Sequence, residues 1–402
     1  MKISPLTIGI GVSMTVGYGT LYYSFSLLAP EIAREFGWDK SFVFSIFSVA
    51  LLIGAMSAPL IGLLVDRFGA RIVMCVGTIM ASSILALFSQ VHSAVELSVL
   101  ILAMECISLT VQYETGFAAL AQIHRKAADT HITGVTLIAG FASTIFWPLI
   151  QLLLTHMDWR DVYLVLACIN VVFCLPVHVL IPRKKAANLL AATGSLPPEQ
   201  QQKDTDTYRS RSFEIMILLG VIFSTSSYIM SAMSASLPVL LGDIGYSTSA
   251  IALAGIMIGP AQVASRLLNL SFGSRLAPTD TALVASAAMG FSMVWLLLAG
   301  IWAVIPLAIL FGLTYGIGQG LSSIVKGLLP LNYFPVSQYG RITGKLSTVR
   351  LVLAAAAPVA TIFLIEKFGS RVAVATLAFA AVLGVLAIIR LKKIRPDNNP
   401  AC

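Results

Sequence analysis

Four charged side chains lie inside long apolar stretches of this sequence, where a charge is costly. They are Glu105, Glu114, Arg266 and Lys326, and Arg350 is a fifth, near the start of its stretch. At the centre of a membrane-spanning helix each such charge costs about 2.5–3.5 kcal/mol, so each residue needs a reason. A carboxyl group in an apolar setting can exchange a proton near neutral pH, and an arginine can bind a carboxylate bidentately. These residue types therefore indicate proton exchange and anion binding.

The two glutamates share one apolar stretch and are nine residues apart. In a continuous helix, at about 100° per residue, that spacing turns the two carboxyl groups to opposite faces, so they cannot both line one cavity. Glu105 shares its face with Ser108, Gln112 and Thr115, and we expect it to be a proton or ligand site. Glu114 is expected at about the depth of Arg266. Pairing with that arginine would serve either proton coupling or structure alone.

Polar stripes accompany these charges on neighbouring stretches. One stretch carries Tyr315, Gln319, Ser322 and Lys326 on one helix face, together with several glycines. This pattern is typical of a moving helix that lines a cavity, although Lys326 stands near the end of its stretch and could instead extend to the surface. Stripes of small residues around Tyr228 and Thr20 suit either cavity lining or close helix packing. We expect the substrate to be bound by Arg266, Lys326, Gln319, Tyr315, Gln112 and Tyr228.

The composition indicates the class of protein that carries these residues. Of 402 residues, 57% are hydrophobic and only 11% are charged, against roughly 25% charged in a soluble domain. A soluble fold of this size could not bury so much apolar surface, whereas lipid solvates it. The net charge of +8 lies in short runs between apolar stretches and does not indicate nucleic-acid binding. The sequence therefore predicts an integral protein of the lipid bilayer.

Cysteine and histidine usage argues against metal and enzyme chemistry. Cys75, Cys106, Cys168 and Cys174 lie within apolar stretches, and with Cys402 they form no C-x-x-C pair. The 5 histidines are scattered along the chain, and no phosphate-binding P-loop is present. We therefore expect no metal site, no cofactor and no catalytic residue, and neither an enzyme nor a receptor.

Twelve apolar stretches are each long enough, at about 20 residues, to cross a bilayer as a helix. They cover residues 6–29, 41–64, 72–92, 95–121, 132–155, 161–181, 213–241, 247–271, 280–301, 304–329, 342–365 and 372–391. The predicted fold class is an all-α integral membrane protein. We expect an N-terminal six-helix bundle over 1–181, a cytosolic linker over 182–212, a C-terminal six-helix bundle over 213–391 and a cytosolic tail over 392–402.

Lysine and arginine predict the orientation of these spans. The side opposite the linker holds only Arg34, Lys40, Arg160, Lys367 and Arg371. Because cytosolic loops are enriched in Lys and Arg, we expect the linker and both termini to be cytosolic.

The two halves also repeat each other. Ile132-Thr133-Gly134 and Ile342-Thr343-Gly344 begin the fifth and eleventh spans, and Pro148 and Pro358 follow at the same distance. Phe68-Gly69-Ala70-Arg71 and Phe272-Gly273-Ser274-Arg275 follow the second and eighth spans. Matches at equivalent places indicate a duplicated six-helix unit with both copies in the same orientation.

The loop after the second span carries a longer motif. It reads Gly62-Leu63-Leu64-Val65-Asp66-Arg67-Phe68-Gly69-Ala70-Arg71 and resembles the G-x-L-x-D-R-x-G-x-R signature of the major facilitator superfamily. The resemblance implies a conformational latch made of Gly62, Asp66, Arg67, Gly69 and Arg71. We expect Asp66 near a helix N-terminus of the other bundle. The counterpart in the second half has Leu270 in place of the aspartate, so no symmetric latch is expected there.

A finer resemblance, to the monocarboxylate and oxalate–formate branches, rests on three segments. They are Leu28–Trp38, Pro59 before the signature loop, and Asp158-Trp159-Arg160. Those branches carry a carboxylate-binding arginine late in span eight, where Arg266 stands here. The antiporter signature of span five is not met by Gly140–Pro148, so antiport is not indicated.

Together these features predict a secondary transporter of a small organic anion that works by alternating access with proton coupling. The expected partners are an anionic small molecule, protons and the bilayer, with no nucleic acid and a monomeric state. The expected location is a bacterial cytoplasmic (inner) membrane. The alternative is an efflux transporter for drugs or toxic metabolites.

Overall fold

The computed structural model describes residues 4–124, 128–182, 198–272 and 276–394, and within these ranges it contains helices and no strand. The first half comprises α1 (Pro5–Gly17), η1 (Tyr18–Tyr23), α2 (Ser24–Phe36), α3 (Lys40–Phe68), α4 (Ala70–Phe88), α5 (Ala94–Ser108), α6 (Tyr113–His124), α7 (Ala128–Ala139), α8 (Ala142–Leu154), α9 (Trp159–Ile169), η3 (Asn170–Cys174) and α10 (Leu175–Leu180). The second half comprises α11 (Pro198–Ile244), α12 (Thr248–Phe272), α13 (Pro278–Ala299), α14 (Ile305–Tyr333), η6 (Val336–Gln338), α15 (Tyr339–Phe368) and α16 (Ser370–Lys393).

Eleven segments of the described chain are long and apolar enough to cross a membrane. The helical stretch Pro5–Phe36 matches the expected first span, and its serines, glycines and tyrosines lower its hydropathy. The prediction of a twelve-helix, all-α membrane fold is therefore confirmed. α11 begins at Pro198, inside the stretch predicted as linker. The rest of that stretch from 183 to 197, the second Phe-Gly-Ser-Arg copy after Phe272, and the tail beyond Ile394 lie outside the described residues.

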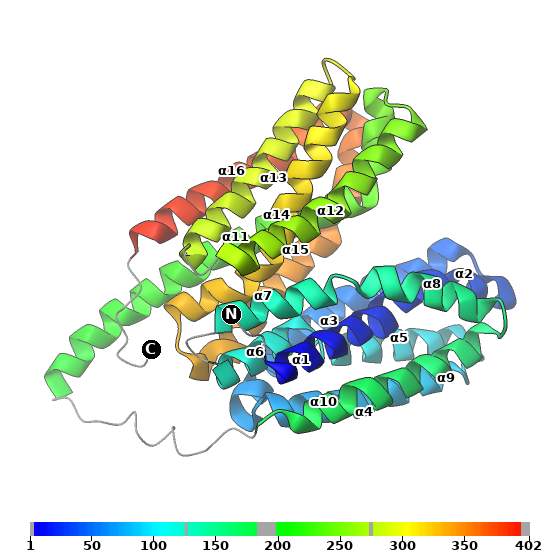
Figure 1. The fold of residues 1–402 in the computed structure, drawn as a ribbon, viewed down its shortest axis with the longest axis horizontal. Helices are drawn as coiled ribbons and strands as arrows, with labels where there is room; N and C mark the ends of the chain where they lie inside the picture. The colour runs from blue at the N-terminus through cyan, green and yellow to red at the C-terminus, as the bar shows by residue number, and fades with distance from the viewer. Residues whose placement is uncertain (1–3, 125–127, 183–197, 273–275, 395–402) are drawn as a thin grey trace.

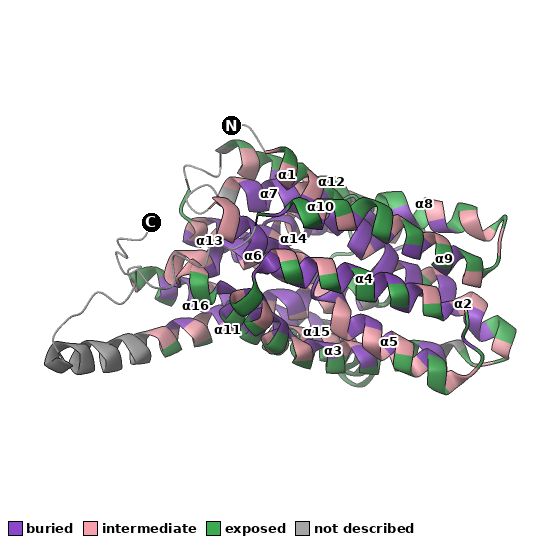
Figure 2. Ribbon diagram, turned by 90° about the horizontal axis from the view of Figure 1, so that it is seen from below, coloured by how far each residue is buried: buried purple, intermediate pink, exposed green. Residues whose placement is uncertain are grey.

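The helices form two bundles that meet at one end and diverge at the other (Figure 1). The bundles touch through α3 with α15, α7 with α12 and α14, and α6 with α15. We call the end near Asp66, His124 and Tyr339 the closed end, and the end near Lys40, His156 and Ile301 the open end. Figure 2 shows buried residues turned toward neighbouring helices and exposed residues turned outward. Many of the exposed residues are large and apolar, such as Met56 and Val359, as lipid-facing positions require.

Four spans of the N-terminal bundle are interrupted. η1 and η3 are π-helical segments in the first and sixth spans, and α5 ends at Ser108 before α6 begins. The fifth span breaks between α7 and α8 at Gly140. In the described part of the C-terminal bundle, each of α12 to α16 passes through its span unbroken. Interrupted helices expose backbone groups at membrane depth, which is where transporter sites are built.

Side chains of neighbouring segments satisfy the freed backbone and hold these interruptions. Asn170 Nδ2 donates to Thr20 Oγ1 and so ties η3 to η1. Thr115 Oγ1 donates to the carbonyl of Leu109 in the turn between α5 and α6, at 2.8 Å. This turn lies between Glu105 and Glu114, so the expectation that one continuous helix carries both residues is wrong.

Candidate functional site

The signature loop joins the two bundles at the closed end. Asp66 accepts hydrogen bonds from the backbone N–H groups of Gly340, at 2.9 Å, and Arg341, at 2.7 Å. These residues form the first turn of α15, whose N–H groups have no partner inside the helix and whose dipole favours a negative charge. Asp66 thus lies at the helix N-terminus where the sequence places it. Its function as a latch stays a prediction.

Glycines permit the close approach of α3 and α15. A Cβ atom at Gly340 would lie 2.6 Å from the carbonyl oxygen of Gly62, so neither position has room for a side chain. Gly69 has φ 83° and ends α3 in a conformation that favours glycine. Arg67 lies over the ring of Phe68, 5.2 Å from its centroid, and Arg71 is partly exposed in the first turn of α4.

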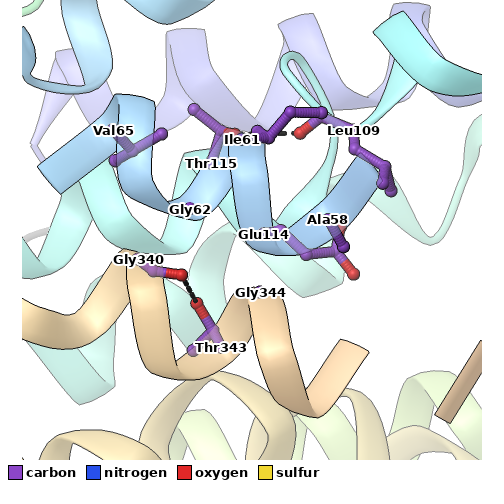
Figure 3. A pocket seen from close by; sticks show the side chains of 10 residues that line it. All are labelled: Ala58, Ile61, Gly62, Val65, Leu109, Glu114, Thr115, Gly340, Thr343 and Gly344. Carbon is purple, nitrogen blue, oxygen red and sulfur yellow. Dashed lines mark hydrogen bonds between the residues drawn. The ribbon is translucent and has the colours of Figure 1, made fainter. Parts of the chain in front are cut away.

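A small cavity lies directly beside this contact (Figure 3). Its volume is about 10 Å³, which suits about one water molecule. Glu114 and Thr115 line it from one bundle, and Gly340, Thr343 and Gly344 line it from the other.

Glu114 forms an ion pair across the bundles. Arg350 Nη2 of α15 donates to Glu114 Oε1 at 2.6 Å, and Ser347 Oγ donates to the same oxygen at 3.3 Å. The two charged side chains are only 15% and 17% exposed. The expected pairing of Glu114 with Arg266 is therefore wrong. α15 presents Arg350 one turn from Ser347, and α6 begins beside them, so this arginine is the nearer partner.

Arg266 makes a different contact with the N-terminal bundle. It is 4% exposed on α12, and its Nη1 donates to the carbonyl of Thr136 at 2.9 Å. Thr136 belongs to the last turn of α7, where a cation is favoured, and its carbonyl also accepts from the backbone N–H of Gly140 at 3.1 Å. A side chain at Gly140 would collide with the same guanidinium. Arg266 thus caps the C-terminal end of α7 and does not contact Glu114.

Lys326 forms neither an ion pair nor a hydrogen bond to an oxygen atom among the described residues. Its Nζ lies 4.0 Å from Met230 Sδ of α11, and the side chain is partly exposed. Because helical side chains lean toward the helix N-terminus, Lys326 points from α14 toward the open end. Glu114 and Arg350 are within electrostatic range. The interpretation that Lys326 extends to the surface at its own end is wrong.

The other expected binding residues are not all gathered there. Gln319 is partly exposed on α14, two turns from Lys326. Tyr315 is buried, stacks on Phe311 and donates from its hydroxyl to the carbonyl of Met230 at 3.3 Å. Gln112 is buried in the turn before α6. Tyr228 lines a groove of about 640 Å³ between α11, α15 and α16.

Glu105 is enclosed within the N-terminal bundle. It is 7% exposed, and its Cβ would lie 3.0 Å from a Cβ placed on Gly54 of α3. Within the described ranges no cation forms an ion pair with it. Tyr22 of η1 lies within its electrostatic range.

Two tyrosines complete the region between the bundles and were not among the expected site residues. The rings of Tyr18 and Tyr113 have centroids 4.8 Å apart. Tyr113 is within electrostatic range of both Arg266 and Glu114. The sequence signal for these two residues is the cluster of tyrosines in η1 and the position of Tyr113 next to Glu114.

Comparison with known proteins agrees with this geometry. The family model described as Major Facilitator Superfamily matches residues 10–350. Human monocarboxylate transporter 6 is 22% identical over 356 residues, which cover 80% of this chain and 67% of the relative. Mouse monocarboxylate transporter 4 is 25% identical over 49% of this chain and 42% of its own length. The multidrug transporter MdfA of Edwardsiella ictaluri is 25% identical over 38% of this chain and 37% of its own length.

Solved structures with the same arrangement share little sequence. The human organic anion transporter MFSD10 superposes with a TM-score of 0.72 at 15% identity, covering 96% of this chain and 100% of the other. The proton:xylose symporter XylE superposes with a TM-score of 0.71 at 12% identity, covering 98% and 97%. These neighbours are transporters, not enzymes. With two six-helix bundles, the signature loop at their contact and a family match over most of its length, the chain is a membrane transporter that belongs to the major facilitator superfamily.

Proposed function

We propose that this transporter carries a small organic anion of the monocarboxylate class by proton-coupled alternating access. The observation that carries the proposal is the charge balance at the contact between the bundles. Arg350 is paired with the carboxylate of Glu114, Arg266 donates to the carbonyls of Thr136 and Gly320, and Lys326 forms no ion pair among the described residues. Uncompensated positive charge inside a membrane is costly unless an anion arrives to balance it. The relatives named as monocarboxylate and organic anion transporters support the same class of substrate.

The contacts at the closed end suggest how an anion would promote the conformational change. The state described here requires the Glu114–Arg350 pair, the Asp66 cap of α15 and the Arg266 cap of α7. A substrate carboxylate bound by Lys326 competes with Glu114 for the nearby Arg350. Substrate binding then weakens a bridge that keeps this end shut, so the ligand shifts the equilibrium through its differential affinity.

Proton coupling is assigned to Glu105, with Glu114 as the second candidate. A buried carboxyl group without a cation favours its neutral form, so Glu105 would take up a proton when the bundle closes around it. Glu114 is the second candidate because its carboxylate already forms an ion pair with Arg350. We also propose a monomer in a bacterial cytoplasmic membrane with both termini cytosolic.

The Glu105→Gln variant is expected to transport without responding to a pH gradient. Glutamine has the size of the protonated acid and cannot release a proton. Uptake into proteoliposomes driven by an inward proton gradient should fall at least about tenfold, while exchange of labelled for unlabelled substrate continues. Glu96→Gln is the matched control, because Glu96 is exposed in the first turn of α5, where it accepts from the backbone N–H of His92. Unchanged gradient-driven uptake in Glu105→Gln would contradict the assignment.

Flux measurements test the substrate class directly. Radiolabelled lactate, pyruvate and formate are offered to proteoliposomes with and without a pH gradient, and at least one should accumulate or compete. If none is transported or competes, the monocarboxylate proposal fails.

The second candidate, drug efflux, is supported by the partial similarity to MdfA. It predicts that overexpression raises resistance to cationic or amphipathic compounds and that these compounds, not carboxylates, stabilise the purified protein.

A further inference from the structure

The signature loop has a counterpart in sequence at the open end of the molecule. Asp66-Arg67-Phe68-Gly69-Ala70-Arg71 ends α3, and Glu366-Lys367-Phe368-Gly369-Ser370-Arg371 ends α15. The order in both is acid, base, Phe, Gly, small residue, Arg. α3 and α15 pack against each other across the bundles. α3 ends at the closed end, where α15 begins, so the two acids lie at opposite ends of one antiparallel helix pair.

The backbone repeats as well as the sequence. Gly69 has φ 83° and ψ 154°, and Gly369 has φ 84° and ψ 164°. Each glycine N–H donates to the carbonyl four residues earlier, that of Val65 or of Ile365, at 2.9 Å in both cases. The acid three residues before each glycine is therefore presented from the same helical position in the same local geometry.

Only one of the two acids, Asp66, contacts the N-terminus of a helix in this state. Asp66 accepts from the first turn of α15. Glu366 is exposed and has no hydrogen bond or ion pair among the described residues. The helix end that faces it across the bundles is the start of α3, where the N-cap residue Asp39 makes no side-chain cap. The two bundles diverge toward the open end in this state (Figure 1).

We propose that Glu366 is a positioning residue for the opposite conformation, in which it caps the first turn of α3 as Asp66 here caps the first turn of α15. Closing the open end brings the end of α15 to the start of α3, and a glutamate reaches one carbon further than an aspartate. First-turn N–H groups of a helix favour a carboxylate. Each state of the transporter then has one helix-end cap, and the transition exchanges one cap for the other.

Distances between spin labels at positions 92 and 302, in the open-end loops of the two bundles, test this proposal in a cysteine-free background without any substrate. Asp66→Asn removes the negative charge and one of the two accepting oxygens of the cap seen here, and it is expected to raise the short-distance population, in which the open end is closed. Adding Glu366→Gln to Asp66→Asn should lower that population up to about fivefold, the effect of one negative charge at a helix N-terminus. Lys367→Gln in the same background is the control and should change nothing, while Glu366→Asp should retain part of the effect.

Two results would overturn the proposal. One is an unchanged distance distribution when Glu366→Gln is added. The other is a shift in the same direction as that caused by Asp66→Asn. Glu366 is exposed, so loss of folding is not expected, and a melting curve of each variant verifies this. The readout is conformational, so it stands apart from the substrate class proposed above.

Discussion

The Glu114→Gln variant is expected to be less stable than the unchanged protein by about 3 kcal/mol, and adding Arg350→Gln is expected to recover most of that loss. Glu114 and Arg350 are paired at 2.6 Å with little exposure to solvent. Removing the carboxylate leaves a guanidinium enclosed between the bundles, near the second cation Lys326. Removing both charges leaves two amides that can bond each other and Ser347. The cavity of about 10 Å³ beside the pair limits the loss, because one water can solvate the arginine.

Thermal unfolding of the detergent-purified protein, with all four members of the double-mutant cycle, measures this coupling. Ser347→Ala is the matched control, since it removes only a hydrogen bond to Glu114 and is expected to cost about 1 kcal/mol. Equal and additive losses in the two single variants would show that the pair contributes no coupling. If Glu114→Gln is stable but the double variant is not, Arg350 has another partner in the state that dominates in solution.

The sequence was informative where a physical requirement acts on one segment at a time. Apolar length located the spans, and the glycines and charge of the signature loop placed Asp66 at a helix N-terminus of the other bundle, where the structure has it. Both requirements are local: a span must match the bilayer thickness, and a carboxylate is favoured at the N-terminus of a helix.

The arrangement of the candidate site was less predictable, because its helices are interrupted by contacts between distant residues. The turn between α5 and α6 depends on Thr115 bonding Leu109, and η1 depends on Asn170 of the sixth span. Helical spacing assumes that the helix is unbroken, and so it placed Glu105 and Glu114 on one continuous helix. The choice of Arg350 over Arg266 as partner of Glu114 also depends on how α12 and α15 cross the other bundle, which residue spacing within one helix does not encode.

Replacing Lys326 by alanine is expected to weaken substrate binding about 10- to 150-fold, the value of one charge-assisted hydrogen bond of roughly 1.5–3 kcal/mol. The reason is that Lys326 is the cation between the bundles without a carboxylate or carbonyl partner in the described chain. Arg266, in contrast, already donates to Thr136, so Arg266→Lys should disturb the closed end more than it disturbs affinity. Lys326→Arg keeps the charge and should retain part of the affinity.

Binding of the transported anion to each purified variant, measured by calorimetry or by ligand-induced thermal shift, separates affinity from turnover. Lys367→Ala is the control, because it removes an equal charge from the exposed end of α15. An unchanged dissociation constant in Lys326→Ala would show that this lysine does not bind the anion. If instead Arg266→Ala alone abolished binding, the anion would have to displace the carbonyl of Thr136, and the cap of α7 would be the element that substrate releases. In either case we expect the interrupted helices of the N-terminal bundle to offer backbone groups to the anion. The unbroken helices α12, α14 and α15 of the other bundle carry the positive charges.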